Sequence, residues 1–359
     1  MQTLTRVVIT FGSLLLPCLV TAQAQNYAVS GPALGLVAER AAGAIRPILG
    51  IPGAATWGAP LAVDFATVQT TVAPGGDYAL VVAKEGFRVA TVRAADAAVQ
   101  WLALAETDSA PDMVAFSPRG QAAALYYRAS GRLVVLSGLR DGTAQASEVD
   151  TTSLPAAPSL VAVSEDASSL LVAIAEGDRT ALYFLPAAQA APQPRVWAMI
   201  TGEDPSTPGD APAVTQARRL TVFGAVSAIE FAGESLDALI ADTGANAVYL
   251  MRDASGAANT MLLGSEQDGL AQPVSIRALD SRRVLVANAG TGSVTVLYRD
   301  GTSPLSIQCG CTLAGLYPLS GGAVFRLTEP SAEPLLLLDA GGLEPRIVAV
   351  PPAPEGGVQ

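Results

Sequence analysis

Residues 286–297 read Val-Ala-Asn-Ala-Gly-Thr-Gly-Ser-Val-Thr-Val-Leu, with an apolar segment at each end and a turn between them. Asn and Gly reach positive φ at low cost, which tight hairpin turns require, so this stretch predicts two short strands joined by a turn. Segments that are apolar at every position recur along the chain, at residues 80–83, 133–136, 170–173, 238–241, 284–287 and 335–338. Strands without polar alternation must be buried on both faces.

Two other structures could contain such apolar segments. Buried helices need about 10 or more residues, whereas these segments end within a few residues at Gly, Asp or Pro. A parallel α/β sheet needs helical crossovers, and no amphipathic helical pattern of 10 to 15 residues separates the segments. The sequence therefore predicts an all-β chain whose sheets stack face to face.

The segments recur with a regular spacing. We place the first strand of each unit near Val68, Met113, Leu160, Val226, Val274 and Leu313, which gives spacings of 45, 47, 66, 48 and 39 residues. Four of these spacings match the length of one propeller blade. The long one contains a stretch rich in Pro, Gly and Asp at residues 202–210, which predicts a loop inserted between two units, near residues 200–218.

A four-stranded sheet that is apolar on both faces cannot stand alone in water, and radial stacking buries both faces against its neighbours. We therefore predict a β-propeller of four-stranded antiparallel blades. Residues 34–39 and 45–50 predict two more strands before the first full unit. Seven blades with the first one short is the favoured prediction, and six blades with this hairpin on the rim is the alternative.

Several units resemble known propeller repeats. Residues 286–297 resemble the YVTN repeat, and residues 238–250 resemble both the YVTN and NHL repeats. Residues 113–120, which contain Phe-Ser-Pro-Arg-Gly, resemble a strand and turn of WD40-like and TolB-like propellers, and residues 161–166 repeat it more weakly. The resemblance implies a propeller fold and little about function, since propellers include enzymes, receptors and scaffolds.

The first 24 residues have the layout of a secretory signal peptide: Arg6, an apolar stretch at residues 7–20, and Ala22-Gln23-Ala24. We expect cleavage after Ala24, which leaves residues 25–359 as a single propeller domain. The apolar stretch is shorter than the about 20 residues of a membrane span, and Pro17 precedes Cys18 where a lipobox has a small residue. We therefore predict export to the periplasm or the cell exterior, without a membrane span or a lipid anchor.

Composition excludes several classes of function. The formal charge of −11 makes nucleic acid an unfavourable partner. The chain contains no histidine, which removes Ser-His-Asp and Cys-His catalysis and His-ligated metals. It also separates the chain from the lactonase and nitrite-reductase relatives of YVTN-like propellers, whose sites use histidine. There is no phosphate-binding loop and no nucleophile elbow.

Three sets of polar or aromatic residues have both a functional and a structural interpretation. Glu203, Asp204 and Asp210 could bind Ca²⁺, but their spacing lacks the regular ligand pattern, which favours a solvated loop. Core packing is the favoured interpretation of the aromatic residues that could otherwise form a glycan or peptide platform: Trp57, Trp101, Trp197, Tyr126 and Tyr127. Solvated turns explain equally well the arginine pairs that could hold an acidic ligand: Arg218 with Arg219, and Arg282 with Arg283.

Cys309 and Cys311 are the cysteines that follow the predicted signal peptide. In an exported chain a disulfide is the first expectation, although a pair two residues apart closes a small, strained ring. Two buried thiols come second and a redox-active dithiol third. Two thiolates make only half of a zinc shell, so we predict no metal site and no cofactor.

These observations favour an exported, monomeric, non-enzymatic binding or scaffold propeller that recognises a protein or a glycan through its loop surfaces. The alternative is a carboxylate-based hydrolase or lyase with its site in the central funnel. Two or more Asp or Glu side chains converging at one mouth of the channel would favour the alternative.

Overall fold

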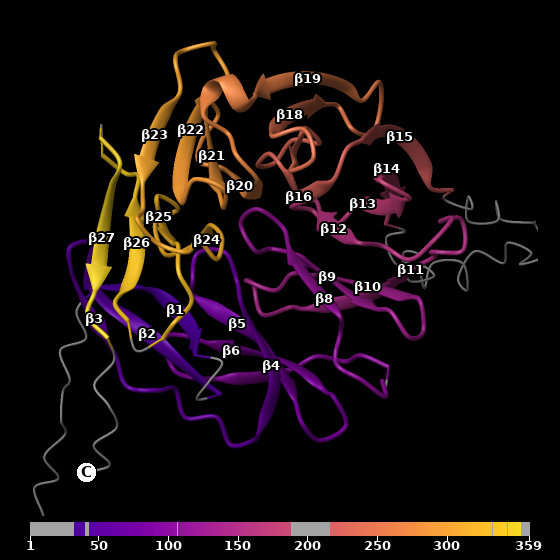
Figure 1. The fold of residues 1–359 in the computed structure, drawn as a ribbon. Helices are drawn as coiled ribbons and strands as arrows, with labels where there is room; N and C mark the ends of the chain where they lie inside the picture. Colours follow the sequence, from indigo (N-terminus) through magenta and orange to yellow (C-terminus); the bar gives the residue numbers. More distant parts are fainter. Residues whose placement is uncertain are drawn as a thin grey trace, which may run out of the picture. The chain divides into compact units, whose positions relative to one another are not determined.

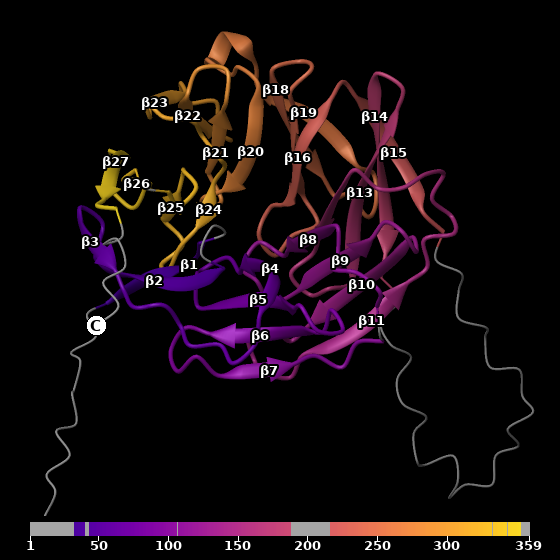
Figure 2. The ribbon, with the colours of Figure 1, turned by 60° about the horizontal axis from the view of Figure 1, so that its bottom comes forward.

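Twenty-seven β-strands form seven antiparallel sheets in the part of the chain that the computed structural model describes, namely residues 32–39, 43–105, 107–187, 216–331, 333–342 and 344–352. Each sheet is a blade, and the blades follow one another around a ring (Figure 1; Figure 2). In these residues the only helical element is a single 3-10 turn, η1 (Glu266–Asp268). The structure is a seven-bladed β-propeller, which confirms the all-β prediction and the favoured blade count.

Blade 1 has three strands and each of the other blades has four, in sequence order across the sheet. The strands of blades 1 to 4 are β1 (Ala33–Glu39), β2 (Ala44–Ile51), β3 (Ala54–Trp57), β4 (Thr67–Val72), β5 (Tyr78–Ala83), β6 (Val89–Arg93), β7 (Val99–Trp101), β8 (Met113–Phe116), β9 (Ala123–Tyr127), β10 (Arg132–Ser137), β11 (Gln145–Val149), β12 (Leu160–Val163), β13 (Ser169–Glu176), β14 (Arg179–Pro186) and β15 (Arg218–Phe223). The strands of blades 5 to 7 are β16 (Val226–Phe231), β17 (Ala238–Asp242), β18 (Ala247–Arg252), β19 (Asn259–Gly264), β20 (Pro273–Ala278), β21 (Arg283–Asn288), β22 (Ser293–Tyr298), β23 (Leu305–Gln308), β24 (Tyr317–Pro318), β25 (Val324–Arg326), β26 (Leu335–Asp339) and β27 (Arg346–Val350).

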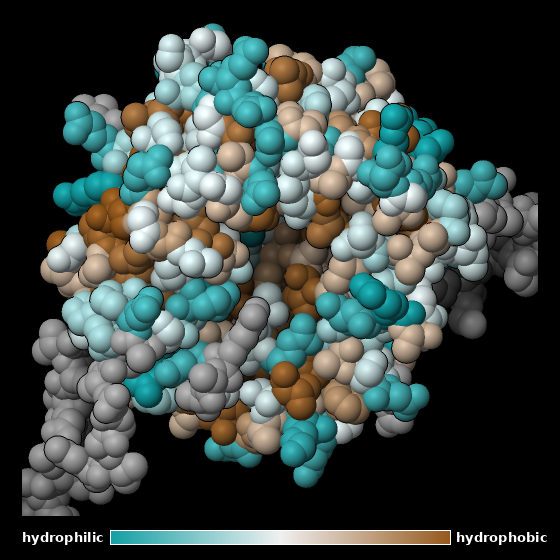
Figure 3. Space-filling view, in the orientation of Figure 1, coloured by the Kyte–Doolittle hydropathy of each residue, from teal (hydrophilic) through white to brown (hydrophobic). Residues whose placement is uncertain are grey.

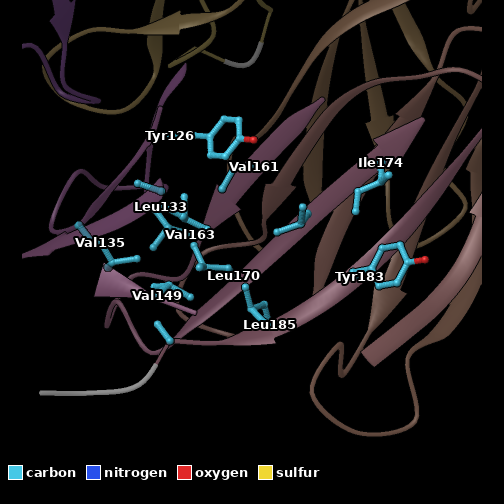
Figure 4. Close-up of a cluster of buried hydrophobic side chains, with 14 of the residues drawn as sticks. Tyr126, Leu133, Val135, Val149, Val161, Val163, Leu170, Ile174, Tyr183 and Leu185 are labelled. Atoms are coloured by element: carbon cyan, nitrogen blue, oxygen red, sulfur yellow. The ribbon is translucent and has the colours of Figure 1, made fainter. Parts of the chain in front are cut away.

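The hydrophobic core lies between the blades, in seven clusters that each join two neighbouring blades. Strand β9 shows how one apolar strand serves two clusters. Leu125 and Tyr127 pack towards blade 2, whereas Ala124 and Tyr126 pack towards blade 4. Figure 4 shows the second of these clusters, where Tyr126 lies near Val161 of β12. This is why the strands lack polar alternation: each face of a blade is buried by the next sheet.

The repeated strand-and-turn motif also joins one blade to the next. Asp242 ends β17, is buried, and accepts hydrogen bonds from the backbone N–H groups of Gly224 (2.7 Å) and Ala225 (3.0 Å), which precede blade 5. Asn288 holds the equivalent place at the end of β21, and its Oδ1 accepts a hydrogen bond from Ala271 N, 3.3 Å away, before blade 6. A short polar side chain after an apolar strand therefore ties the turn to the connection between blades.

The inner strand of blade 1 runs in the opposite direction to the inner strand of blade 2. Leu36 N near the start of β1 donates to Gly76 O, 2.8 Å away, just beyond the end of β4. Glu39 at the end of β1 and Thr67 at the start of β4 line one shared cavity. The inner strands of these two neighbouring blades are therefore antiparallel to each other.

The ring closes between blade 1 and blade 7 by packing. Within the described residues, no sheet contains strands from both blades. Instead, a cluster that includes Ile48 and Leu337 joins them, and Trp57 Nε1 donates a hydrogen bond to Pro351 O, 2.8 Å away. Closure therefore depends on buried apolar surface, which contributes roughly 1.5 to 3 kcal/mol for each fully buried large aliphatic side chain.

Two predicted positions were wrong. Blade 7 begins at Tyr317 rather than near Leu313. Leu313 is apolar because it is buried in the cluster between blades 6 and 7, and not because it begins a strand. The predicted insertion does not lie between two units. Strands β14 and β15 pair in the same sheet, so residues 187–217 connect the third and fourth strands of blade 4.

The predicted signal peptide, residues 1–24, lies outside the described residues, and so do Trp197 and the acidic residues Glu203, Asp204 and Asp210. Among the residues that the structure describes, no helix is long and apolar enough to cross a membrane.

Candidate functional site at one mouth of the channel

The first strands of the seven blades surround a central cavity of about 280 Å³. Most of the residues that line it are apolar, Val37, Val72, Phe116 and Val163 among them. Figure 3 shows one face of the ring hollowed near its centre, with apolar side chains around the hollow. Polar chemistry in this cavity therefore depends on the few charged side chains that reach it.

A second cavity, of about 690 Å³, opens at one end of the channel, and we call it the mouth cavity. Its wall is formed mainly by the turns that join the first and second strands of blades 2, 3, 5, 6 and 7. Four arginines and three carboxylates line it: Arg119, Arg140, Arg277, Arg299, Glu230, Glu234 and Asp280. Seven charged side chains line it, against four in the central cavity.

Glu230 and Arg277 line both the channel cavity and the mouth cavity, so they lie where the two meet. Glu230 precedes the last residue of β16 and is 8% exposed, and Arg277 occupies the equivalent position of β20. Arg277 Nη1 lies 3.0 Å from Glu230 Oε2, and Arg277 Nε donates to Leu316 O at 3.2 Å. Burial raises the pKa of Glu230 to about 7, and the Arg277 guanidinium offsets only part of that rise.

The other two carboxylates of the mouth cavity are each paired with an arginine. Asp280 Oδ2 accepts a hydrogen bond from Arg283 Nε, 2.7 Å away in the same turn. Glu234 pairs with Arg119, which joins the turn of blade 5 to that of blade 3. These two side chains are 71% and 61% exposed, so the pair is solvated and contributes little to stability.

Arg299 differs from the other arginines of the mouth cavity. It follows β22, in the turn between the third and fourth strands of blade 6. Its Nε is buried, and among the described residues it has neither a hydrogen-bond partner nor a carboxylate within ion-pair distance. Burial lowers the pKa of the Arg299 guanidinium below its usual value. Leaving a buried guanidinium donor without a hydrogen bond costs folding free energy, so Arg299 is the side chain of the cavity that most needs an explanation.

Among the described residues, the aromatic side chains singled out in the sequence do not form one platform. Trp57 lies in blade 1 and contacts blade 7, whereas Tyr126 and Tyr127 are buried between blades. Trp101 is 38% exposed and packs against Phe65, with ring centroids 4.7 Å apart. The core-packing interpretation therefore holds for both tyrosines.

The two arginine pairs are engaged in ion pairs or backbone contacts. Arg218 donates to Ala254 O at 2.7 Å, and Arg219 pairs with Glu176. Arg282 pairs with Asp300. Arg283 pairs with Asp280, which lines the mouth cavity, but Arg283 itself does not line it. Neither pair forms an arginine site of its own.

Cys309 and Cys311 lie in the connection from β23 to β24 and are joined by a disulfide in the structure. Both are partly buried against the cluster between blades 6 and 7, and neither lines the mouth cavity. Formation of this disulfide in the exported protein remains a prediction.

The residues that matter most here, Glu230, Arg277 and Arg299, were missed from the sequence. A signal for the first two was present. The inner strands of blades 5 and 6 read Val-Ser-Ala-Ile-Glu-Phe and Pro-Val-Ser-Ile-Arg-Ala, so a charge interrupts an apolar strand at the same position of two consecutive units. Aligning the units with one another would have found this pair.

Comparisons with known proteins support the fold. No model of a known protein family matches the chain, and no curated protein matches it. A protein of Bacteroides fragilis NCTC 9343, assigned provisionally as a 6-phosphogluconolactonase, has a similar structure with a TM-score of 0.52, at 13% identity over 89% of this chain and 94% of that one. A protein from Lactobacillus plantarum has a TM-score of 0.51, at 15% identity over 89% of this chain and 96% of that one. At such identities the likeness extends to the propeller fold alone.

Proposed function

We propose that this chain is an exported, non-enzymatic binding propeller that holds part of a protein or glycan ligand at the mouth cavity. The observation that carries the proposal is the pairing of the carboxylates there. Glu230, Glu234 and Asp280 do converge at one mouth, as a carboxylate-based enzyme requires, but each is engaged by an arginine. For Asp280, burial alone would raise the pKa, but hydrogen bonds from Arg282 and Arg283 lower it, which makes this carboxylate a weaker base. The cavity volume, about 690 Å³, lies within the usual range for ligand sites.

Besides the convergence of the carboxylates, one observation favours the alternative, a carboxylate-based hydrolase or lyase. Glu230 is buried beside the channel with its pKa raised to about 7, which is where a general acid or base works best. Hydrolysis of glycosides, however, uses two carboxyl groups with separate roles. Asp280 accepts hydrogen bonds from the backbone N–H groups of Arg282 and Arg283, both at 2.8 Å, which hold it in its turn. These hydrogen bonds lower the pKa of Asp280 although burial opposes them, so Glu230 alone is a weak basis for catalysis.

The remaining parts of the proposal come from the sequence. We propose that residues 1–24 are removed on export to the periplasm or the cell exterior, and that residues 25–359 act as a monomer with an insertion near residues 200–218 in one propeller domain. We also propose that the blades are repeats of the YVTN, NHL and WD40-like kind. The equivalent places of Asp242 and Asn288 support this relationship.

The test uses binding and turnover together. The purified protein is applied to a glycan microarray and incubated with a set of chromogenic glycosides. The proposal predicts binding without turnover. Ser281→Trp, which fills the mouth cavity, should weaken binding, whereas Ala129→Trp, in the exposed turn between β9 and β10, should not. Turnover that is lost in Glu230→Gln would establish the alternative and refute the proposal.

A further inference from the structure

We propose that the mouth cavity binds an anionic group of its ligand, a carboxylate, sulfate or phosphate, through Arg299 and Arg277. This inference rests on the proposed function and names the chemical class of the ligand. Its first support is Arg299, whose buried Nε lacks a partner among the described residues while the side chain lines the cavity. An oxyanion in the cavity would bind the part of the Arg299 guanidinium that lines it rather than the inaccessible Nε itself, because a guanidinium can only donate hydrogen bonds.

The second support is the placement of Arg277 relative to Arg299. Arg277 lies one residue before the end of β20, and Arg299 follows the end of β22. Both strands run towards the same end of blade 6, since β21 is antiparallel to each of them. Both side chains line the mouth cavity. One blade therefore presents two guanidinium groups to a single space.

Arg277 retains donors for a ligand. Its Nε is used by Leu316 O and its Nη1 by Glu230, and no described residue accepts a hydrogen bond from Nη2. A guanidinium group has five N–H donors in a planar fork, which matches the oxygens of a carboxylate or phosphate. The ion pair with Glu230 holds Arg277 in place at the cavity wall without using all of these donors.

The charge of the cavity agrees with an anionic ligand although the chain as a whole is acidic. Four arginines and three carboxylates line the mouth cavity, whereas the full chain carries a formal charge of −11. Three of the arginines pair with a carboxylate, Arg119 with Glu234, Arg140 with Asp77 and Arg277 with Glu230, which leaves Arg299 without such a partner among the described residues. The carboxylates that face it from blades 5 and 6 are Asp237 and Asp280, and these accept hydrogen bonds from Asp253 N and from Arg283 Nε, respectively. The charged side chains that line the cavity therefore have a formal excess of one positive charge, and charge interactions in a partly desolvated site are stronger than in bulk water.

The experiment is isothermal titration calorimetry of the purified protein with sodium sulfate and with D-glucuronate, which represent inorganic and sugar-borne anions. D-glucose is the neutral control for glucuronate. We expect saturable binding of at least one anion and none of glucose. Arg299→Ala should weaken that binding by about tenfold or more, because it removes a charge-assisted hydrogen bond. Arg282→Ala is the matched control: it removes an arginine of the same blade that is 72% exposed and does not line the cavity, and affinity should change less than about twofold.

A second measurement does not depend on a folded variant. Phenylglyoxal modifies accessible arginines, and peptide mass spectrometry of the wild-type protein identifies which ones. The bound anion should protect Arg277 and Arg299 but not Arg282. Absence of saturable anion binding, equal weakening in Arg299→Ala and Arg282→Ala, or equal protection of all three arginines would overturn the inference. If the inference fails in this way, two further results decide about the proposed function. Binding of a neutral glycan that is lost in Ser281→Trp would support the proposed function. Turnover without retained binding would refute it.

Discussion

Glu230 and Arg277 meet where the channel opens into the mouth cavity, with Nη1 and Oε2 3.0 Å apart. They occupy equivalent positions on the inner strands of blades 5 and 6, so two consecutive copies of one structural unit supply opposite charges. Burial outweighs the attraction between them, because the pKa of Glu230 is raised to about 7 rather than lowered. The pair therefore changes its charge near pH 7.

The first prediction concerns stability. The pKa of Glu230 is raised from 4.5 to about 7 in the folded protein, so between these values the folded state binds more protons than the unfolded state. The stabilising contribution is fully present below about pH 4.5 and is lost as the pH rises through 7. It amounts to about 3 kcal/mol between pH 4 and pH 8. Urea denaturation at several pH values measures it.

The control for this prediction is Glu230→Gln, which keeps the shape of the side chain and cannot titrate. The difference in unfolding free energy between wild type and variant cancels the titration of all other groups. It should shift in favour of the variant as the pH rises from 5 to 8. A constant difference across that range would show that Glu230 does not titrate near pH 7.

The second prediction links protonation to anion binding. A bound anion near Arg277 favours protonated Glu230, so binding takes up a proton and tightens as the pH falls from 8 to 6. Arg277 of β20 and Glu165 of blade 4 are the charged groups that act on Glu230. The change cannot exceed about tenfold per pH unit, because a single group is involved. Calorimetry with sulfate, whose charge is constant over this range, measures the affinity; the same pH dependence in Glu230→Gln would contradict the assignment.

The fold was predictable because a strand that is buried on both faces is apolar at every position, and such segments can be recognised in the sequence. Strands β5, β9 and β17 are buried at every position, and their apolar segments were evident in the sequence. The one misplaced first strand follows the same rule. Leu313 is buried in a connection rather than in a strand, and apolar character alone does not distinguish the two.

The site was not predictable to the same extent, because it depends on which strand is innermost and on which end of each blade faces the mouth. Arg282 and Arg283 stood out in the sequence as a pair, yet Arg282 points to Asp300 at the surface. Arg299 lies in the adjacent turn and carries no local sequence signal, since its isolation from carboxylates exists only in three dimensions. Spacing along the chain therefore identified the blades but not the mouth.

The third prediction concerns the contact between blades 1 and 2. Gly76 has φ of +67°, and a Cβ added there would lie 2.6 Å from the Cα of Gly35. Gly76→Ala should therefore lower the free energy of unfolding by the about 1 to 2 kcal/mol of a left-handed alanine, plus about 1 to 3 kcal/mol for the steric clash. Gly131→Ala is the matched control, because Gly131 has φ of +66° and nothing within 4 Å of the added atom. Equal losses in the two variants, measured by urea denaturation, would contradict a close contact between the blades.

The last prediction concerns Cys309 and Cys311, which are joined in the connection between blades 6 and 7. The loop that they close is so short that the entropic stabilisation should be well under the about 3 kcal/mol of a 15-residue loop. The double variant with Cys309→Ser and Cys311→Ser should therefore keep nearly all of the wild-type stability in urea denaturation. A loss of several kcal/mol would mean that the two sulfur atoms act instead as well-packed core groups.

The same two residues allow a test of export by counting thiols. Thiol titration of the denatured wild-type protein without reductant should find none if the pair is oxidised and if Cys18 has been removed with residues 1–24. One thiol per chain would show that Cys18 is retained, and two would show that Cys309 and Cys311 are reduced. Mass spectrometry of the N-terminus separates the two conclusions, because a mature chain that begins at Gln25 contains only the Cys309 and Cys311 sulfur atoms. An intact Met1 together with a single thiol would contradict cleavage while leaving the disulfide in place.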